Sequence, residues 1–439
     1  MGVGVTEIQS VIRNASGGEI GACPFWLQLP RDAPGNNCRL LLAAHLCYNR
    51  LTGNTAQQQT IAQTMERRLL KNADPMLLAC VLAIVAYGAL MVYSCTGVRT
   101  GESAPLGASK FRLHLLWIAL GLVCLALAAS VDYLKLARFK WHIYAVTLGL
   151  LVLVLARGYI SHGAQRWIEL GPVRFQPAEL AQLTLIIVLG IALAERPELR
   201  RSLATLTLSL GIVALPTALI FFEPDLGTPV ILVGIWLVML VVYGMPFGRL
   251  AAVCALGLIV VVVGLGALWV SGHMPEHQQQ RLMAFVYPDA DPEGSGWHSM
   301  QSIIAIGSGG LVGKGLFEGT QSELGFVPEQ ETDFIMTVVG EEWGFVGSVV
   351  LLALYFILLY RVLDIAMAAK DECGRLIAAG IAAMIFLHVF INVGMTLRLL
   401  PAKGLPLPFF SYGGSSMITG MLAIGLLESI CMRRHKITF

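Results

Sequence analysis

The 439-residue chain has few charged side chains. Asp, Glu, Lys and Arg make up only 13% of it, whereas 56% of its residues are hydrophobic. A soluble domain carries roughly 25% charged residues, so this composition excludes an ordinary soluble protein and indicates an integral membrane protein. The mean hydropathy of +0.71 agrees with that class. The net charge of +2 is uninformative, because the positions of charges matter more than their sum in such a protein.

The chain also lacks the patterns of several common functional sites. Its nine cysteines have no Cys-x-x-Cys spacing, so we expect neither a zinc site nor a disulfide scaffold. No Gly-x-Gly-x-x-Gly, Walker or His-Glu-x-x-His motif is present, and we expect no nucleic-acid partner. An enzyme that works without a nucleotide needs a substrate that is already activated.

Residues 1–64 differ from the rest of the chain. They are of mixed polarity, and no basic segment precedes a continuous apolar core, so we expect no signal peptide. Met65 begins a basic flank, Met-Glu-Arg-Arg-Leu-Leu-Lys-Asn, that leads into the first apolar run. Our hypothesis is that Met65 is the natural start and that 1–64 is a dispensable, non-native or disordered cytoplasmic extension. Residues 65–439 would then form one membrane domain.

Long apolar runs fill that domain. A spanning helix needs about 20 mostly apolar residues. The runs predict an all-α membrane protein with ten transmembrane helices and a long extracytoplasmic loop between the seventh and the eighth. The predicted spans are roughly 76–97, 112–131, 141–160, 179–195, 204–222, 228–245, 247–271, 334–360, 377–399 and 408–431.

Lys and Arg predict the orientation of these spans. If the N-terminal end of the first span is cytoplasmic, the inner loops are roughly three times denser in Lys and Arg than the outer segments. This asymmetry favours that arrangement, because positive residues concentrate in cytoplasmic loops. Both termini are then expected in the cytoplasm, and the long loop at 272–333 is expected outside.

Asp333 lies at the end of this loop, in Pro-Glu-Gln-Glu-Thr-Asp-Phe-Ile at 328–335, at or just inside a bilayer boundary. Burying an ionised carboxylate there is costly, which makes Asp333 a candidate functional group. The alternative is an Asp that caps free backbone N–H groups at a helix N-terminus, and the two roles can coexist.

The loop itself is far longer than usual, and such loops are commonly functional or disordered. Its glycine-rich part at 301–315 permits tight backbone approach and has the pattern of an amphipathic re-entrant segment. The alternative is a surface loop packed on the helix bundle. The loop carries nine Asp and Glu against Arg281 and Lys314, so most cations for an anionic substrate must come from elsewhere.

Three other outer segments carry polar groups. The segment at 163–179 offers Arg166 and Arg174, and guanidinium groups form bidentate bonds to phosphate oxygens. The segment at 223–228 places two carboxylates between the fifth and sixth spans. The Pro/Gly-interrupted run at 399–416 leads into the last span, and interrupted helices at membrane depth line cavities. Each signal alone is weak, because a lone interfacial Arg more often snorkels to headgroups.

Taken together, these segments resemble the SEDS family, the shape, elongation, division and sporulation polymerases of bacterial walls. The resemblance covers about residues 65–436, with the motifs in order. Gly319-Thr-Gln-Ser and Asn392-Val-Gly-Met-Thr are more similar to the RodA (elongation) branch than to the FtsW (division) branch. The matching runs are Gly163-Ala-Gln-Arg-Trp-Ile, Phe175-Gln-Pro-Ala-Glu, Pro224-Asp-Leu-Gly-Thr, Ala305-Ile-Gly-Ser-Gly-Gly, Gly319-Thr-Gln-Ser, Thr332-Asp-Phe-Ile, Gly340-Glu-Glu and Pro406-Leu-Pro-Phe-Phe-Ser-Tyr-Gly-Gly-Ser-Ser.

The resemblance implies a peptidoglycan glycosyltransferase of the bacterial cytoplasmic membrane. Such an enzyme polymerises lipid II into β-1,4 glycan strands on the outer face during cell elongation and shape maintenance. The resemblance also implies a class B penicillin-binding protein as the partner transpeptidase, besides the lipid bilayer. It maps the catalytic Asp of the family onto Asp333.

The chemistry of lipid II agrees with these roles. Its undecaprenyl diphosphate is a good leaving group, so no ATP is needed, and one inverting displacement converts the α linkage of the donor into the β product. We expect Asp333 to act as the general base for the acceptor hydroxyl. Arg166, Arg174 and Lys314, with or without a divalent cation such as Mg or Mn, are candidates to stabilise the diphosphate.

The remaining site residues come from the matching motifs and from the glycine-rich segment at 301–315. Four more are expected to bind the diphosphate or the sugars, namely Glu179, Gln301, Ser302 and Ser415. Three are expected to support the site, namely Asp225, Glu341 and Glu342.

The sequence departs from the family pattern at four positions. Gln182 stands where the family often has Lys, which removes a possible phosphate contact. Glu331 stands where His is common, and its negative charge would raise the pKa of Asp333. Arg398 and Lys403 replace the expected Gly and Thr, and our hypothesis is that they are compensating cations.

Two rival functions stay open on the sequence alone. A lipid II flippase fits many spans with broken helices, but it predicts charged groups near the bilayer midplane, where the spans show few. His388 is the exception, and a lone His is more often a satisfied structural residue. A catalytically silent scaffold for the transpeptidase is the second rival, and retention of the complete motifs argues against it.

Overall fold

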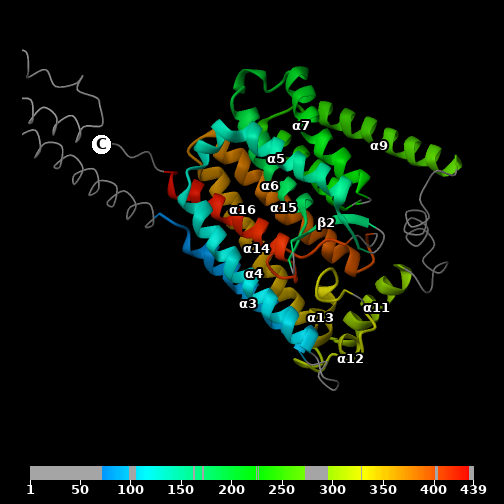
Figure 1. The fold of residues 1–439 in the computed structure, drawn as a ribbon. Coiled ribbons are helices and arrows are strands. Elements are labelled where there is room, and N and C mark those ends of the chain that lie inside the picture. Colours follow the sequence, from blue (N-terminus) through cyan, green and yellow to red (C-terminus); the bar gives the residue numbers. More distant parts are fainter. Residues whose placement is uncertain are drawn as a thin grey trace, which may run out of the picture. The chain divides into compact units, whose positions relative to one another are not determined.

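The computed structural model of the chain is mostly helical (Figure 1). It describes residues 72–97, 105–161, 164–170, 173–223, 225, 227–271, 295–327, 329–400 and 404–434. The hypotheses about Met65 and residues 1–64, and the one about Lys403, lie outside these ranges.

Helices lie at each of the predicted apolar spans. Within the described ranges, eight are long and apolar enough to cross a membrane, and two further helices contain shorter apolar stretches, Gly227–Tyr243 and Phe247–Gly257. The chain is therefore a multi-pass membrane protein. These helices are α3 (Pro75–Gly97), α4 (Pro105–Ser130), α5 (Leu136–Arg157), α6 (Pro177–Ala194), α7 (Leu203–Phe222), α8 (Gly227–Tyr243), α9 (Phe247–Val270), α14 (Gly344–Ala368), α15 (Glu372–Thr396) and α16 (Gly414–Met432).

The prediction of one continuous helix at 334–360 is wrong. The run is divided at Trp343 into the short α13 (Ile335–Glu342) and the long α14. Gly344 has a φ of 64°, which ends regular helix geometry and which glycine tolerates best. Two backbone N–H groups in the first turn of α14 then donate to carbonyls of the preceding loop at 3.0 Å. The loop thus satisfies groups that a helix start leaves without partners.

The last span also begins later than predicted, at Gly414 rather than 408. The segment 404–413 is not helical. Pro406 and Pro408 lack backbone N–H groups and disfavour helix in the residue before each of them. This part of the Pro/Gly-rich run is consequently an ordered segment whose carbonyls are available to other elements.

A small sheet departs from the all-α expectation. Strands β1 (Tyr159–Ser161), β2 (Ala164–Leu170) and β3 (Val173–Phe175) form an antiparallel sheet in the order β1-β2-β3. In the β2–β3 register, Glu169 lies opposite Arg174, where opposite charges stabilise a cross-strand pair. The outer segment that was expected only as a loop between spans therefore has a fixed register.

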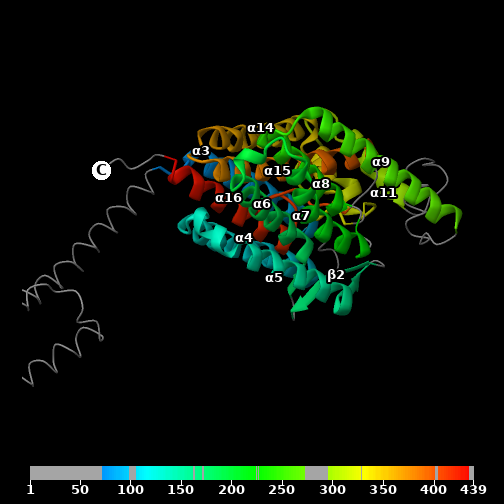
Figure 2. The same ribbon diagram turned by 90° about the horizontal axis from the view of Figure 1, so that it is seen from above.

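Two helices form the interior of the bundle. α15 packs against α6, α8 and α14, and α6 and α15 lie among the other helices in Figure 2. Small residues allow the close approach of their backbones. A Cβ on Gly190 would lie 2.9 Å from the Ile377 side chain, and one on Gly380 would lie 2.8 Å from Ile186. Polar residues on the inner faces of α6 and α15 are consequently shielded from lipid.

Two short helices precede α13. They are α11 (Ser295–Ser308) and α12 (Thr320–Glu323). α11 packs against α13 and α15. This part of the long loop therefore packs on the helix bundle, which was one of the two alternatives for it. The Gln330 side-chain amide, in the turn that carries Asp333, donates to the Ser322 carbonyl oxygen of α12 at 3.0 Å, so the packed loop also borders that turn.

Candidate active site

Asp333 ends a tight turn immediately before α13. The carbonyl oxygen of Glu329 accepts hydrogen bonds from the backbone N–H groups of residues 332–334 at 3.1 to 3.3 Å. Glu329 itself has a φ of 51°, a left-handed conformation that is uncommon for a residue with a side chain. The N-cap of α13 is Phe334, without a side-chain cap. The carboxylate of Asp333 is therefore not used to cap this helix.

Two other elements contact Asp333. The side-chain amide of Asn392, on α15, donates to the Asp333 carbonyl oxygen at 2.9 Å and to the Leu405 carbonyl oxygen at 2.8 Å. Gly404, before α16, lies so close that a Cβ there would be 2.8 Å from Asp333 Oδ2. Asn392 and Gly404 were assigned no role from the sequence, although Asn392 belongs to one of the matching motifs.

Burial and the surrounding charges together shift the pKa of the Asp333 carboxyl group. Burial is the main cause that raises the pKa of Asp333 to about 7, and the negative charge of Glu329 acts in the same direction. The Arg166 guanidinium opposes this effect, while Asp225 and Glu331 add to it. A carboxyl group with a pKa near 7 can take up a proton in a reaction at neutral pH.

Arg166 links the sheet to the turn after α7. It lies on β2, and its Nε is 3.5 Å from the backbone carbonyl oxygen of Glu223. Burial and Asp225 raise the pKa of the fully buried Glu223 to about 8, against the lowering effect of Arg166. Arg166 is thus the cation that acts electrostatically on both Glu223 and Asp333.

Asp225 has a structural role at the start of α8. Its Oδ1 accepts from the backbone N–H groups of Gly227 at 2.9 Å and Thr228 at 3.4 Å, and its Oδ2 accepts from the Thr228 hydroxyl at 2.7 Å. This is the capping role that an Asp commonly has before a helix. Asp225 is also buried, and it contributes to the raised pKa of Asp333.

A buried polar chain connects α6 to α15. Nε2 of His388 is 2.8 Å from Oε1 of Gln182, and Nδ1 of His388 is 3.3 Å from the Pro406 carbonyl oxygen. Gln182 Nε2 in turn lies 3.5 Å from Glu179 Oε2. Both nitrogens of His388 have partners, as expected for a structural histidine. Gln182, at the position of the missing Lys, contacts His388 and Glu179.

Arg174 and Ser415 lie at the edge of this region. Arg174 Nε is 3.1 Å from Glu169 Oε1, and both side chains are substantially exposed. The Ser415 hydroxyl, at the start of α16, accepts from the backbone N–H of Gln176 at 2.9 Å. Ser415 is therefore a bridge between α16 and the entry to α6.

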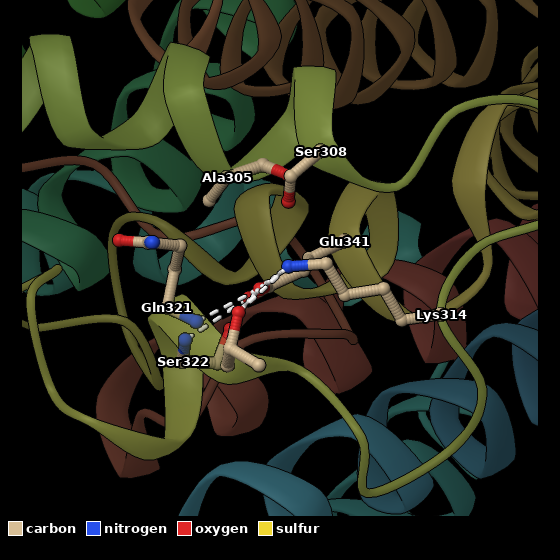
Figure 3. A network of polar contacts seen from close by, with 7 residues as sticks. Ala305, Ser308, Lys314, Gln321, Ser322 and Glu341 are labelled. Atoms are coloured by element: carbon tan, nitrogen blue, oxygen red, sulfur yellow. Dashed lines mark hydrogen bonds and ion pairs between the residues drawn. The ribbon is translucent and has the colours of Figure 1, made fainter.

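Lys314 and Glu341 belong to a separate network (Figure 3). Oε1 of the fully buried Glu341 accepts from Lys314 Nζ at 2.7 Å and from the Gln321 N–H at 2.8 Å. Its Oε2 accepts from the N–H and the hydroxyl of Ser322 at 3.0 and 2.6 Å. Burial alone would raise the pKa of Glu341, but the bonds from Lys314, Ser322 and Gln321 together lower it. Lys314 thus anchors the loop to α13.

The other predicted residues of this region also hold helices together. The fully buried Ser302 is 2.7 Å from the Thr337 hydroxyl and donates to the Thr396 carbonyl oxygen at 3.0 Å, so it joins α11 to α13 and α15. Gln301, the residue before Ser302, is also buried. Glu342, also buried, accepts from the Ser94 hydroxyl of α3.

Two positions that depart from the family pattern have contacts of their own. Lys110, on α4, pairs with Glu331 at 2.5 Å, and the Tyr412 N–H donates to the Glu331 carbonyl oxygen at 2.8 Å. Arg398 Nη1 is 3.8 Å from the sulfur of Met300. Lys110 was not singled out in the sequence, and only its place beside the first outer loop could have indicated it.

Among the residues that the structure describes, no group of three or more His, Cys, Asp or Glu side chains is arranged to hold a metal ion. Of the carboxylates that act on the pKa of Asp333, Asp225 caps α8 and Glu331 pairs with Lys110. The described side chains therefore do not form a ready metal centre.

Comparison with known proteins places this arrangement in a family. The FtsW/RodA/SpoVE model, described as "Cell cycle protein", matches residues 74–436. The chain belongs to this family. Curated relatives in the FtsW/RodA/SpoVE family include the peptidoglycan glycosyltransferase MrdB of Escherichia coli K12, 39% identical over 365 residues that cover 83% of this chain and 95% of the relative. The peptidoglycan glycosyltransferase RodA of Treponema pallidum is 31% identical, with coverage of 84% and 100%.

Solved structures agree with this membership. A structure titled "Structural coordination of polymerization and crosslinking by a peptidoglycan synthase complex" matches with a TM-score of 0.69 and 32% identity, covering 83% of this chain and 99% of that one. The crystal structure of the rod shape determining protein RodA from Thermus thermophilus matches with a TM-score of 0.60 and 31% identity, covering 83% and 98%. The RodA-like branch is consistent with these relatives.

Proposed function

We propose that this chain polymerises lipid II into β-1,4 glycan strands, with Asp333 as the general base. As a member of the FtsW/RodA/SpoVE family with curated glycosyltransferase relatives, it is a peptidoglycan glycosyltransferase of cell elongation. The observation that carries the catalytic assignment is the setting of Asp333, whose burial raises its pKa to about 7 beside the Arg166 guanidinium.

The base acts on the acceptor sugar. When the 4-hydroxyl of the acceptor GlcNAc attacks C1 of the donor MurNAc, its proton passes to a carboxylate oxygen of Asp333. The new C–O bond forms as the bond from C1 to the diphosphate breaks, which inverts the anomeric centre in one step. A base whose pKa lies near the working pH is ionised before the reaction and still basic enough to accept the proton.

The diphosphate leaves with the electrons of the broken bond and therefore gains negative charge. Arg166 supports this step, because a guanidinium placed where charge develops stabilises the transition state. Its electrostatic reach already extends to Asp333 and Glu223. Arg174, exposed and paired with Glu169 across the sheet, is a second candidate contact at the mouth of the site.

The proposed membrane arrangement is the one expected from Lys and Arg. The ten helices at the predicted spans would all cross the bilayer, both termini would be cytoplasmic, and Asp333 would face outward. The spans that would end in the cytoplasm carry cations beside those ends, namely Lys140, Arg200 and Arg375. Each of them pairs with a carboxylate, which agrees with a positive inner side. A class B penicillin-binding protein is the proposed partner transpeptidase.

The test uses the purified full-length protein with its transpeptidase and labelled lipid II. We expect glycan ladders from the wild type and a loss of roughly 10²–10⁴-fold in Asp333→Asn, the effect of removing a general base. Asp364→Asn is the matched control, since Asp364 is partly exposed on α14 and pairs with Arg361. Equal rates for Asp333→Asn and the control would refute the assignment.

Two further outcomes address the rival functions. Transfer of lipid II across sealed vesicles without polymer would support a flippase instead. Full activity of the partner transpeptidase with Asp333→Asn, together with no polymer from the wild-type complex, would support a scaffold.

A further inference from the structure

The proposed catalytic residue is held by a segment that the reaction scheme does not use. Residues 404–407 precede α16 and are not helical. The Leu405 side chain is buried, and it packs where a Cβ on Gly227 would lie 3.1 Å away, at the capped start of α8. This packing fixes the segment against the bundle.

Side chains of α15 fix the same segment through its backbone. His388 contacts the Pro406 carbonyl oxygen at 3.3 Å, and Asn392 donates to the Leu405 carbonyl oxygen at 2.8 Å. The two residues are four apart, so they lie on one face of the helix, one turn from each other. They consequently bind two successive carbonyls of the segment.

The second N–H of the Asn392 side-chain amide donates to Asp333. That bond, 2.9 Å to the Asp333 carbonyl oxygen, ties the turn before α13 to the same amide that holds Leu405. Asn392 is completely buried, and its Oδ1 has no hydrogen-bond partner among the described residues. A buried acceptor without a partner costs free energy, so the amide is placed for its two N–H donors.

Gly404 completes the arrangement. Its backbone lies against the carboxylate, because a Cβ there would be 2.8 Å from Asp333 Oδ2. Gly404 is exposed and does not have a positive φ, so neither core packing nor backbone conformation requires glycine at this position. The missing side chain is needed only to leave room for the carboxylate.

We propose that Asn392 and Gly404 are positioning residues that seat the Asp333 carboxylate for proton transfer, Asn392 through the backbone of Asp333 and Gly404 through the space beside Oδ2. This inference rests on the proposed role of Asp333 as the base. Neither residue exchanges a proton or contacts the substrate in this scheme.

The first variant is Gly404→Ala. The added methyl group meets the end of a flexible side chain, so Asp333 rotates away while the fold is retained. Misplacing a catalytic group by about 1 Å can lower the rate on the order of 10²-fold, and we expect a loss of 10–100-fold in kcat with an unchanged melting temperature. Gly307→Ala is the control, because Gly307 is exposed on α11 and a Cβ there has nothing within 4 Å.

The second variant is Asn392→Ala, with Thr396→Val as its control. Thr396 is buried on the same helix, and its hydroxyl bonds only locally, to the Val393 carbonyl oxygen. Both changes remove one buried polar group, but only Asn392→Ala frees Asp333. We expect kcat to fall in Asn392→Ala beyond any fall in Thr396→Val, with KM for lipid II changed little.

The pH profile of kcat distinguishes a positioning effect on Asp333 from a general loss of stability. A loosened carboxylate becomes better hydrated, so its pKa falls towards the ordinary value and the acidic limb of kcat shifts to lower pH in Asn392→Ala. The groups that face Asp333 from the packed elements stay the same in this variant. They are Arg166 on β2, Glu179 on α6, Asp225 before α8, and Glu329 and Glu331 in its own turn.

The outcomes are distinguishable from failure of the proposed function. Inactive Asp333→Asn together with wild-type kcat in Gly404→Ala and Asn392→Ala would overturn the positioning role of Asn392 and Gly404. The role of Asp333 as the base would stand. Active Asp333→Asn would overturn the base itself. Equal losses of kcat in Asn392→Ala and Thr396→Val, without a shift of the acidic limb of the pH profile, would also overturn the positioning role of Asn392.

Discussion

Lys110 and Glu331 form an ion pair between α4 and the turn that carries Asp333, with Nζ 2.5 Å from Oε1. The pair joins two segments 221 positions apart in the chain. Half of the Lys110 side chain is exposed, but Glu331 is only 14% exposed. The negative charge that replaces the usual His of the family is therefore compensated locally, two residues before Asp333.

Removing Lys110 should shift the pH profile of the enzyme. Glu331 raises the pKa of Asp333, and Lys110→Ala leaves that charge without its cation, so the acidic limb of kcat should move to higher pH. Because Lys110 is half exposed, its charge is screened by solvent, and the shift should stay below about one pH unit. Glu331→Gln should move the limb in the opposite direction. A profile that is identical in Lys110→Ala and the wild type would contradict this coupling.

The wild-type rate should itself depend on pH through Asp333. Because the base acts in its ionised form and its pKa is raised to about 7, kcat should rise with pH through about 7 and fall about tenfold per unit below that value. The measurement is polymer formation from lipid II between pH 5 and 9, with each sample returned to pH 8 to confirm that the protein survived. A rate that is flat between pH 5 and 8 would count against Asp333 as the base.

The same pKa shift affects stability with the opposite sign. A carboxyl group whose folded pKa is raised binds its proton more tightly in the folded state, so its stabilising contribution is full below its unfolded pKa and is lost as the pH rises through about 7. Asp333→Asn removes this loss. We expect the melting temperature of the variant to gain on the wild type as the pH is raised from 5 to 8, and a constant difference would refute the burial of the charge.

Glu341 should be needed for the fold rather than for the chemistry. Glu341→Gln keeps the size of the side chain but removes the charge that pairs with Lys314 and turns one acceptor into a donor that faces N–H groups. Losing such buried partners costs about 1–3 kcal/mol, measurable as a lower melting temperature in detergent. Since the pKa of Glu341 is lowered, its stabilisation exists above the ordinary pKa of Glu and is lost in acid.

Lys314→Met is the companion variant for Glu341. It should destabilise the protein in the same direction, and the double variant should cost less than the sum of the two single changes, because both remove one network. If Lys314→Met lost polymerisation with an unchanged melting temperature, the ammonium would act on the diphosphate after all.

Gln182 should stabilise the fold through its contacts with His388 and Glu179. Gln182→Leu fills the same space without polar atoms and leaves Nε2 of His388 without its 2.8 Å contact, so we expect a loss of about 1–3 kcal/mol in stability. Thr184→Val on the same helix is the control, because Thr184 is buried and its hydroxyl is 2.9 Å from the Thr147 hydroxyl rather than in the chain to His388. A loss no larger than in this control would mean that the contact with His388 contributes little.

The sequence by itself determined the class, the helix positions and the identity of the candidate base. Spans are readable because every backbone polar group inside a bilayer must be bonded within its own helix, so length and composition suffice. The same local signals overlooked the sheet at 159–175 and the break at Trp343. The break depends on another segment, because the first backbone N–H groups of α14 donate to carbonyl oxygens of the loop at 310–311. The sheet depends on pairing between its three strands, which no single strand reveals.

Only the tertiary structure decided which predicted residues lie together. Asp333 and Arg166 are brought into electrostatic reach, whereas Lys314 is engaged by Glu341, and Ser302 joins helices. The sequence could not separate these cases, because a Lys or a Ser in a motif has the same chemistry whether it faces a substrate or a neighbouring helix. Asn392 and Gly404 acquire their relation to Asp333 only where α15 and the segment before α16 meet the turn at 329–333, and packing determines that meeting.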